Sequence, residues 1–127
     1  MRLNVEMRAH RKLLVWKIAV LLVEDIHKIA LSFPDYERFE LSSQMRKAAV
    51  SVPSNIAEGA ARKSDQGKLH FFNIAQGSLS ELDTQVEIAH RLNYIDNTKY
   101  SEILSKIEAV SLKLYGLSRK IENDRHV

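Results

Sequence analysis

Two Glu-x-x-His pairs, Glu24 with His27 and Glu87 with His90, are the residues of this chain whose types and spacing could hold a metal ion. In dimetal helix bundles this spacing on two helices, with two further glutamates, forms a carboxylate-rich site. Here the helical phase does not fit. Glu24 lies outside the main apolar stripe of its helix and His27 lies on a different stripe, whereas Glu87 and His90 share a solvent-side strip. The sequence therefore predicts no metal site and no cofactor.

Residues for nucleophilic or phosphate chemistry do not form a recognisable motif. No serine lies in a Gly-x-Ser-x-Gly turn, and no Gly-x-x-x-x-Gly-Lys loop is present. Cysteine is absent, which excludes disulfides and thiolate chemistry. We therefore predict a non-enzymatic protein with no small-molecule substrate.

The chain has a net charge of +3, and its basic side chains form two clusters and a ridge. Residues 1–20 hold five basic residues against one acid, and residues 44–68 hold five against two. Lysine then recurs at every seventh position of a helix, so that successive lysines lie about 10 Å apart. The candidate nucleic-acid contacts are Arg8, Arg11, Lys12, Arg46, Lys47, Arg62, Lys63, Lys68, Lys99, Lys106, Lys113 and Lys120. Lysines beside an apolar stripe are also typical of a solvated helix face, and this alternative stays open.

Hydrophobic periodicity predicts four helices and no strands, at about 9–32, 41–62, 65–93 and 97–122. The residue before Pro34 is pushed out of the helical region, which ends the first helix. Ser64 and Asp96 are suitable N-caps for the third and fourth. Short connections make sequential helices antiparallel neighbours. We therefore predict an all-α protein whose residues 1–127 form one up-down-up-down four-helix bundle.

The first helix carries two apolar stripes where a bundle needs only one. The first stripe consists of Val15, Ile18, Leu22, Ile29 and Phe33. The second, nearly opposite, consists of Leu13, Trp16, Val20, Val23 and His27. Soluble monomers rarely expose a large apolar patch, so we predict a homo-oligomer with the second stripe at its interface. The alternative is a broad core-facing surface covered by loops or by the N-terminal segment.

The second and third helices share a polar motif of small and amide side chains. Its members are Ser51, Asn55, Glu58, Gly59, Gly77, Glu81 and Gln85. Several of these could form a hydrogen-bond network between helices. A glycine costs a helix about 1 kcal/mol relative to alanine, so each glycine here is expected to permit a close helix contact.

The composition is that of a soluble globular protein, with 45% hydrophobic and 28% charged residues. The apolar run from 13 to 23 is interrupted by Lys17 and is shorter than the roughly 20 residues that span a bilayer. The chain also opens without a secretory pattern. We therefore expect a cytoplasmic protein with no membrane partner.

Several segments between residues 13 and 95 resemble one bacterial family. They are Leu14-Val15-Trp16 with Ala19, Phe33-Pro34, the stretch from Phe39 to Gly59, and Gly77-Ser78-Leu79 with Glu81, Leu82 and Gln85. This pattern is similar to that of the four-helix-bundle proteins encoded by intervening sequences in large-subunit ribosomal RNA genes, formerly labelled ribosomal proteins. The resemblance implies an antiparallel bundle that assembles as a ring, typically a homopentamer. It assigns no catalytic residues.

The same family is similar in fold to the accessory variability proteins of diversity-generating retroelements, which bind a reverse transcriptase and nucleic acid. The resemblance thus implies RNA, a ribonucleoprotein or a reverse transcriptase as partners, besides further copies of the chain. We expect a non-enzymatic accessory protein that presents a basic surface to structured RNA. The alternative is a protein–protein interaction scaffold that docks another helix on the Ser/Ala-rich face of residues 41–62.

Overall fold

The computed structural model describes residues 8–37 and 40–125. Its elements are the short 3-10 turns η1 (Ala9–Lys12) and η2 (Asp35–Glu37) and the helices α1 (Leu14–Leu31), α2 (Leu41–Ala60), α3 (Asp65–Arg91) and α4 (Asn97–Arg125). The four predicted helices are confirmed, and these two ranges contain no strand. The first helix is shorter than predicted, because Leu13 is extended and separates η1 from α1.

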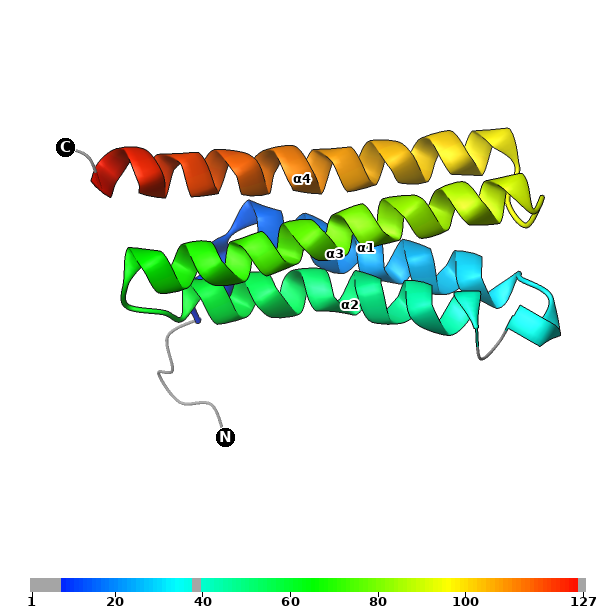
Figure 1. Ribbon diagram of the computed structural model, residues 1–127, viewed down its shortest axis with the longest axis horizontal. Coiled ribbons are helices and arrows are strands. Elements are labelled where there is room, and N and C mark those ends of the chain that lie inside the picture. The colour runs from blue at the N-terminus through cyan, green and yellow to red at the C-terminus, as the bar shows by residue number, and fades with distance from the viewer. Residues whose placement is uncertain (1–7, 38–39, 126–127) are drawn as a thin grey trace.

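The helices run alternately up and down, with α2, α3 and α4 side by side in Figure 1. Each packs against its neighbours in sequence, and α4 closes the bundle against α1. The core is formed where the apolar stripes meet. Its largest fully buried side chains are Leu22, Ile26, Met45, Val52, Ile56, Phe72, Leu79, Leu82, Val86, Ile103, Val110 and Leu114. On α4 the side chains of Ile103, Ile107, Val110 and Leu114 are buried, whereas Leu117 and Ile121 are only half-buried.

The helix ends use local hydrogen bonds that the sequence predicted. Ser64 Oγ accepts the Gly67 N–H at 3.0 Å, and Asp96 Oδ1 accepts the Lys99 N–H at 2.8 Å. These bonds satisfy backbone donors that the first turn of a helix leaves unpaired. The cap positions of α3 and α4 are therefore confirmed.

Asn93 ends α3 in the left-handed backbone region, with φ of 64°. The next residue, Tyr94, donates its N–H back to Ala89 O at 2.9 Å, which closes the helix end. We expect Asn93→Gly to stabilise the fold by a few tenths of a kcal/mol, because glycine has no Cβ to disfavour this conformation. We expect Asn93→Ala to destabilise it by about 1 kcal/mol, because alanine lacks the short polar side chain that lets asparagine adopt the left-handed region. Urea unfolding of both variants checks this. A more stable Asn93→Ala variant would contradict it.

The second stripe of α1 is less exposed than the sequence predicted. Leu13, Trp16 and Val23 are half-buried and pack against the core, and only His27 is fully exposed. The stripe lies on a flank of the helix, so neighbouring segments partly cover it. The most exposed apolar side chains of α1 are instead Leu31 (69%), Leu21 (56%) and Leu14 (54%).

The polar motif of α2 and α3 divides into separate contacts instead of one network. Ser51 Oγ lies 2.7 Å from Ser78 Oγ on α3, and Asn55 Nδ2 donates to Ser51 Oγ at 3.0 Å. Glu58 instead pairs with Arg62 on its own helix at 2.6 Å. Ser78, which was not predicted as part of the motif, thus links α3 to α2 through its hydrogen bond with Ser51.

Among the described residues, the remaining motif members form no hydrogen bond between helices. Gln85 and Glu81 interact along α3 at 3.5 Å. Gly59 is buried against Phe72, which confirms the close contact predicted there. Gly77 is exposed, and a Cβ at that position would meet nothing within 4 Å. The expectation for Gly77 is therefore wrong.

No helix within the two described ranges is both long and apolar enough to cross a membrane.

Candidate nucleic-acid interface

Charge is segregated along the bundle axis, a property that no single segment of the chain shows. One half comprises η1, the start of α1, the ends of α2 and α4 and the start of α3, at residues 8–22, 51–78 and 111–124. This half holds ten lysines and arginines against four acids. The opposite half, residues 23–37, 40–50 and 79–110, holds six against eleven. We call the first the basic half and the second the acidic half.

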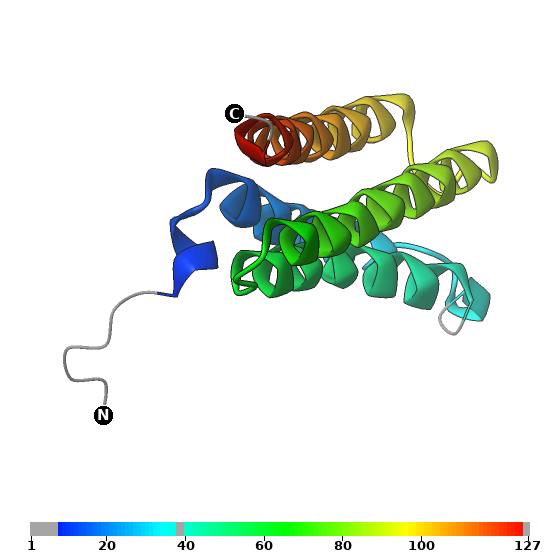
Figure 2. The same cartoon turned by 60° about the vertical axis from the view of Figure 1, so that its left-hand side comes forward.

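Antiparallel packing produces this segregation. Figure 1 shows the α2–α3 turn and the end of α4 at the same end of the molecule. Figure 2, with that end brought forward, shows η1 beside the adjoining ends of α2 and α3. Segments separated by about fifty residues therefore add their charges on one surface.

The structure brings together only some of the predicted nucleic-acid contacts. Those in the basic half are Arg8, Arg11, Lys12, Arg62, Lys63, Lys68, Lys113 and Lys120. Arg46 and Lys47 lie in the acidic half because they begin the helix that ends at the basic half. Lys99 and Lys106 also lie there, and they form ion pairs with Glu102 at 3.2 Å and Asp25 at 2.7 Å. The predicted lysine ridge is thus divided, and only its last two members join the basic surface.

A groove of about 410 Å³ lies within the basic half, between η1 and the end of α2. Its residues are Arg8, Ala9, His10, Ala57, Glu58 and Ala61. The alanine side chains leave room between the turn and the helix. Glu58 is the acid at this groove, and its pairing with Arg62 offsets its charge.

Two arginine–aromatic pairs lie next to residues that line this groove. The Arg11 guanidinium lies 5.2 Å from the centre of the Trp16 ring, and His10 meets the same ring edge-on at 4.9 Å. The Arg62 guanidinium lies 4.6 Å from the centre of the Phe71 ring. Such contacts hold a cation over the electron-rich ring face. These two pairs, defined here as the stacked arginines, orient planar charged groups at the basic surface.

Sequence reasoning missed the aromatic part of this surface. Trp16 was assigned to an oligomer interface and Phe71 to the buried face of its helix, whereas His10 and His70 were assigned no role. The available signal was aromatic residues interleaved with basic ones in two segments. It was weak, because the pairing depends on how η1 turns back on α1.

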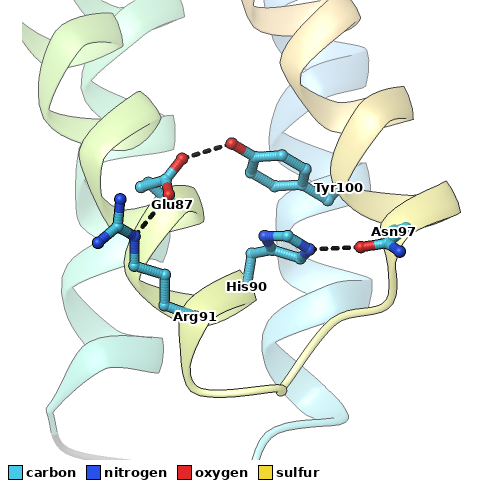
Figure 3. Close-up of polar contacts among 5 residues, drawn as sticks. All are labelled: Glu87, His90, Arg91, Asn97 and Tyr100. Carbon is cyan, nitrogen blue, oxygen red and sulfur yellow. Dashed lines mark hydrogen bonds and ion pairs between the residues drawn. The ribbon is translucent and has the colours of Figure 1, made fainter.

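At the acidic half, Glu87 and His90 lie half-buried against α4 instead of on a solvent-side strip (Figure 3). The Tyr100 hydroxyl donates to the Glu87 carboxylate, and Arg91 Nε donates to the same group at 2.8 Å. His90 stacks on the Tyr100 ring at 3.9 Å, and its Nε2 lies 2.7 Å from Asn97 Oδ1. These contacts join the end of α3 to the start of α4.

The contacts of Glu87 shift the titration of both partners. The hydrogen bonds from Tyr100 and Arg91 lower the pKa of Glu87 below its ordinary value of 4.5. The carboxylate in turn raises the pKa of Tyr100 above 10.0. Within the described residues, no three His, Cys, Asp or Glu side chains gather as metal ligands.

Replacing Tyr100 with phenylalanine tests this contact through its pH dependence. A lowered Glu87 pKa stabilises the fold above pH 4.5, and this stabilisation is lost as the pH falls through the folded-state value. The raised Tyr100 pKa likewise stabilises the fold below pH 10.0, and this stabilisation is lost as the pH rises through the folded-state value. We therefore expect Tyr100→Phe to lower the Tm most between these limits, with the difference narrowing in acid. Thermal scans across pH measure it, with exposed Tyr115→Phe as control. A Tm difference independent of pH would contradict this assignment.

The fold and the surface define a class, that of all-α four-helix-bundle proteins with a basic half and an acidic half. The family model of the 23S rRNA-intervening sequence protein matches residues 11–116. The chain therefore belongs to that family. No curated protein matches.

A solved structure shows the same fold. The chain is similar to a protein of unknown function from the S23 ribosomal protein family of Bacteroides thetaiotaomicron, with a TM-score of 0.77 and 20% identity. The similarity covers 83% of this chain and 95% of that one. At 20% identity, this similarity shows that the two proteins share a fold and nothing further.

Proposed function

We propose that this protein is a non-enzymatic RNA-binding protein that contacts the phosphate backbone with its basic half. The observation that carries the proposal is the segregation of ten basic residues against four acids at one half of the bundle. A net charge of +3 spread evenly would attract RNA weakly, whereas segregated charge creates a local positive potential. The family's association with intervening sequences of 23S rRNA supports structured RNA as the ligand.

Binding of labelled structured RNA at several salt concentrations tests this function. Each phosphate neutralised by a basic side chain releases bound counterions, so affinity should fall steeply as salt rises. We expect a plot of log affinity against log salt to have a slope of about −0.7 to −0.9 for each phosphate contacted. Absence of binding at low salt, or binding indifferent to salt, would refute the proposal.

Self-association is the second part of the proposed function. A groove of about 350 Å³ between α1 and α4 is lined by Ile18, Leu21, Leu22, Glu24, Asp25, Lys106 and Ala109. With exposed Leu14 on the same flank of α1, it presents an apolar surface centred on the Asp25–Lys106 ion pair. We propose a second copy of the chain as its occupant. Apart from that ion pair and Glu24 the lining is apolar, which suits a partner that offers mainly apolar side chains.

A ring of such copies would place every basic half on one rim. The rim would then bind RNA through several weak surfaces at once, with a gain in avidity. We expect light scattering to show an oligomer, with a homopentamer as the proposed state, and Leu21→Glu to shift it to monomer. Val50→Glu, at an exposed apolar side chain of α2, is the matched control. A monomeric wild-type protein at micromolar concentration would contradict this part alone.

The scaffold alternative depends on a free polar face of α2. Ser51 and Asn55 from that face are engaged with each other and with Ser78 of α3. This engagement favours the RNA-binding function. Co-purification with and without nuclease separates the two, since protein partners that survive nuclease would support the scaffold.

A further inference from the structure

The groove between η1 and α2 has a geometry that suits single nucleobases. Half of its lining residues, Ala9, Ala57 and Ala61, are small and apolar. Its volume of about 410 Å³ falls within the range of small-ligand sites, roughly 300–1,000 Å³. A planar aromatic ligand can pack against these alanines, while Arg8 and His10 supply polar groups on the same lining.

The stacked arginines border this groove through direct contacts. On one side, His10 lines the groove and meets the Trp16 ring that Arg11 covers. On the other side, Glu58 lines the groove and holds Arg62 at 2.6 Å while Arg62 covers Phe71. Each pair therefore lies next to a residue that lines the groove, one on the η1 side and one on the α2 side.

Each stacked arginine has part of its surface open to a ligand. Arg11 is exposed, and 46% of the Arg62 side chain is accessible. A guanidinium is planar and weakly hydrated, so it stacks on π systems more readily than a lysine ammonium does. The ring beneath it and, for Arg62, the Glu58 carboxylate hold the group in place before a base arrives.

Unpaired and paired RNA differ in whether their bases can stack on these arginines. In an A-form helix the bases are stacked inside and the major groove is too narrow for side chains. Unpaired nucleotides can turn their bases outward and stack on aromatic rings or guanidinium planes. Exposed Lys12 and Lys63, on the η1 and α2 sides, are then placed to meet the phosphates.

Resting on the RNA-binding function proposed above, we infer that the groove between η1 and α2 binds unpaired nucleotides, whose bases stack on the Arg11–Trp16 and Arg62–Phe71 pairs. The ligand class is thus single-stranded or looped RNA in preference to continuous duplex. Base recognition by stacking tolerates any sequence, because every base has a π face.

The test compares a short mixed-sequence RNA strand with the same strand annealed to its complement. We expect the full-length protein to bind the single strand at least about tenfold more tightly at equal salt. Trp16 is the chain's only tryptophan, so its fluorescence reports on one wall of the groove. We expect the single strand to quench that emission and the duplex to leave it nearly unchanged.

Charge-conserving variants separate stacking from electrostatics. The double variant Arg11→Lys with Arg62→Lys keeps the net charge and should lose the preference for the single strand while retaining duplex affinity and its salt dependence. Arg119→Lys is the matched control, because Arg119 covers Tyr115 on α4 at 5.9 Å, whereas the groove lies between η1 and α2. That control should retain the preference.

Two outcomes would overturn the inference. Equal affinity for the two RNA forms would refute it, and so would a preference that survives the double lysine variant. Both outcomes leave salt-dependent RNA binding intact. Failure to bind either form at low salt would instead refute the proposed function itself.

Discussion

Reversing the charge of Lys12 and Lys63 together is expected to weaken RNA binding by about 100-fold at low salt. These lysines are exposed in the basic half, one on η1 and one on the α2–α3 turn. Each change to glutamate removes a counterion-releasing contact and adds a repulsive charge beside the phosphate backbone. The slope of log affinity against log salt should become shallower by about one for each lysine that contacts a phosphate. Fluorescence anisotropy with labelled RNA measures both quantities.

The acidic half supplies a matched control for this experiment. Lys28 and Lys47 are equally exposed and change the net charge by the same amount when replaced by glutamate. If local potential attracts the RNA, this double variant should weaken binding by no more than about threefold and keep the salt slope. Equal losses in the two double variants would mean that only the total charge matters, and the basic half would no longer be the binding surface.

Replacing Gly59 with alanine is expected to destabilise the bundle by about 1 kcal/mol. An added Cβ would lie 2.6 Å from Phe72 Cε1 and 3.1 Å from the Lys68 carbonyl oxygen. The Phe72 ring is buried in the core and cannot move aside freely. Overpacking of this kind costs about 1–3 kcal/mol, which exceeds the roughly 1 kcal/mol gained from better helix propensity. Urea unfolding measures the change.

Gly77→Ala is the matched control, since it makes the same chemical change at the middle of α3. A Cβ there would meet no atom within 4 Å, so only the propensity gain remains. We expect this variant to be more stable than the parent by about 1 kcal/mol. If both variants stabilised the protein, the contact between α2 and α3 at Gly59 would be looser than the structure shows.

The sequence predicted the helices of this protein well because helix formation is largely local. Apolar residues repeating at three and four positions mark the buried faces, and the side chains of Ser64 and Asp96 cap helices within three residues of themselves. Residue 13 is where this reasoning failed. Its extended backbone separates η1 from α1, although the apolar pattern continues through it.

Predictions that depended on several helices at once were less accurate. The sequence grouped Arg46 with Arg62 as one basic cluster, yet α2 carries them to opposite halves of the bundle. It placed Glu87 on a solvent-side strip, although Tyr100 of α4 donates to its carboxylate. It treated Gly59 and Gly77 alike, although only Gly59 faces a neighbouring ring. In each case the deciding atom belongs to another element.

The sequence by itself determined the all-α class, the four helices, their caps and the apolar stripe that each helix buries, because these follow from contacts within a few residues. Only the tertiary structure decided that η1, the α2–α3 turn and the end of α4 combine their charges at one half, and that the stacked arginines border one groove. The physical reason is that antiparallel packing brings together residues remote in sequence, and the orientation of a side chain on its helix does not specify which neighbour it meets.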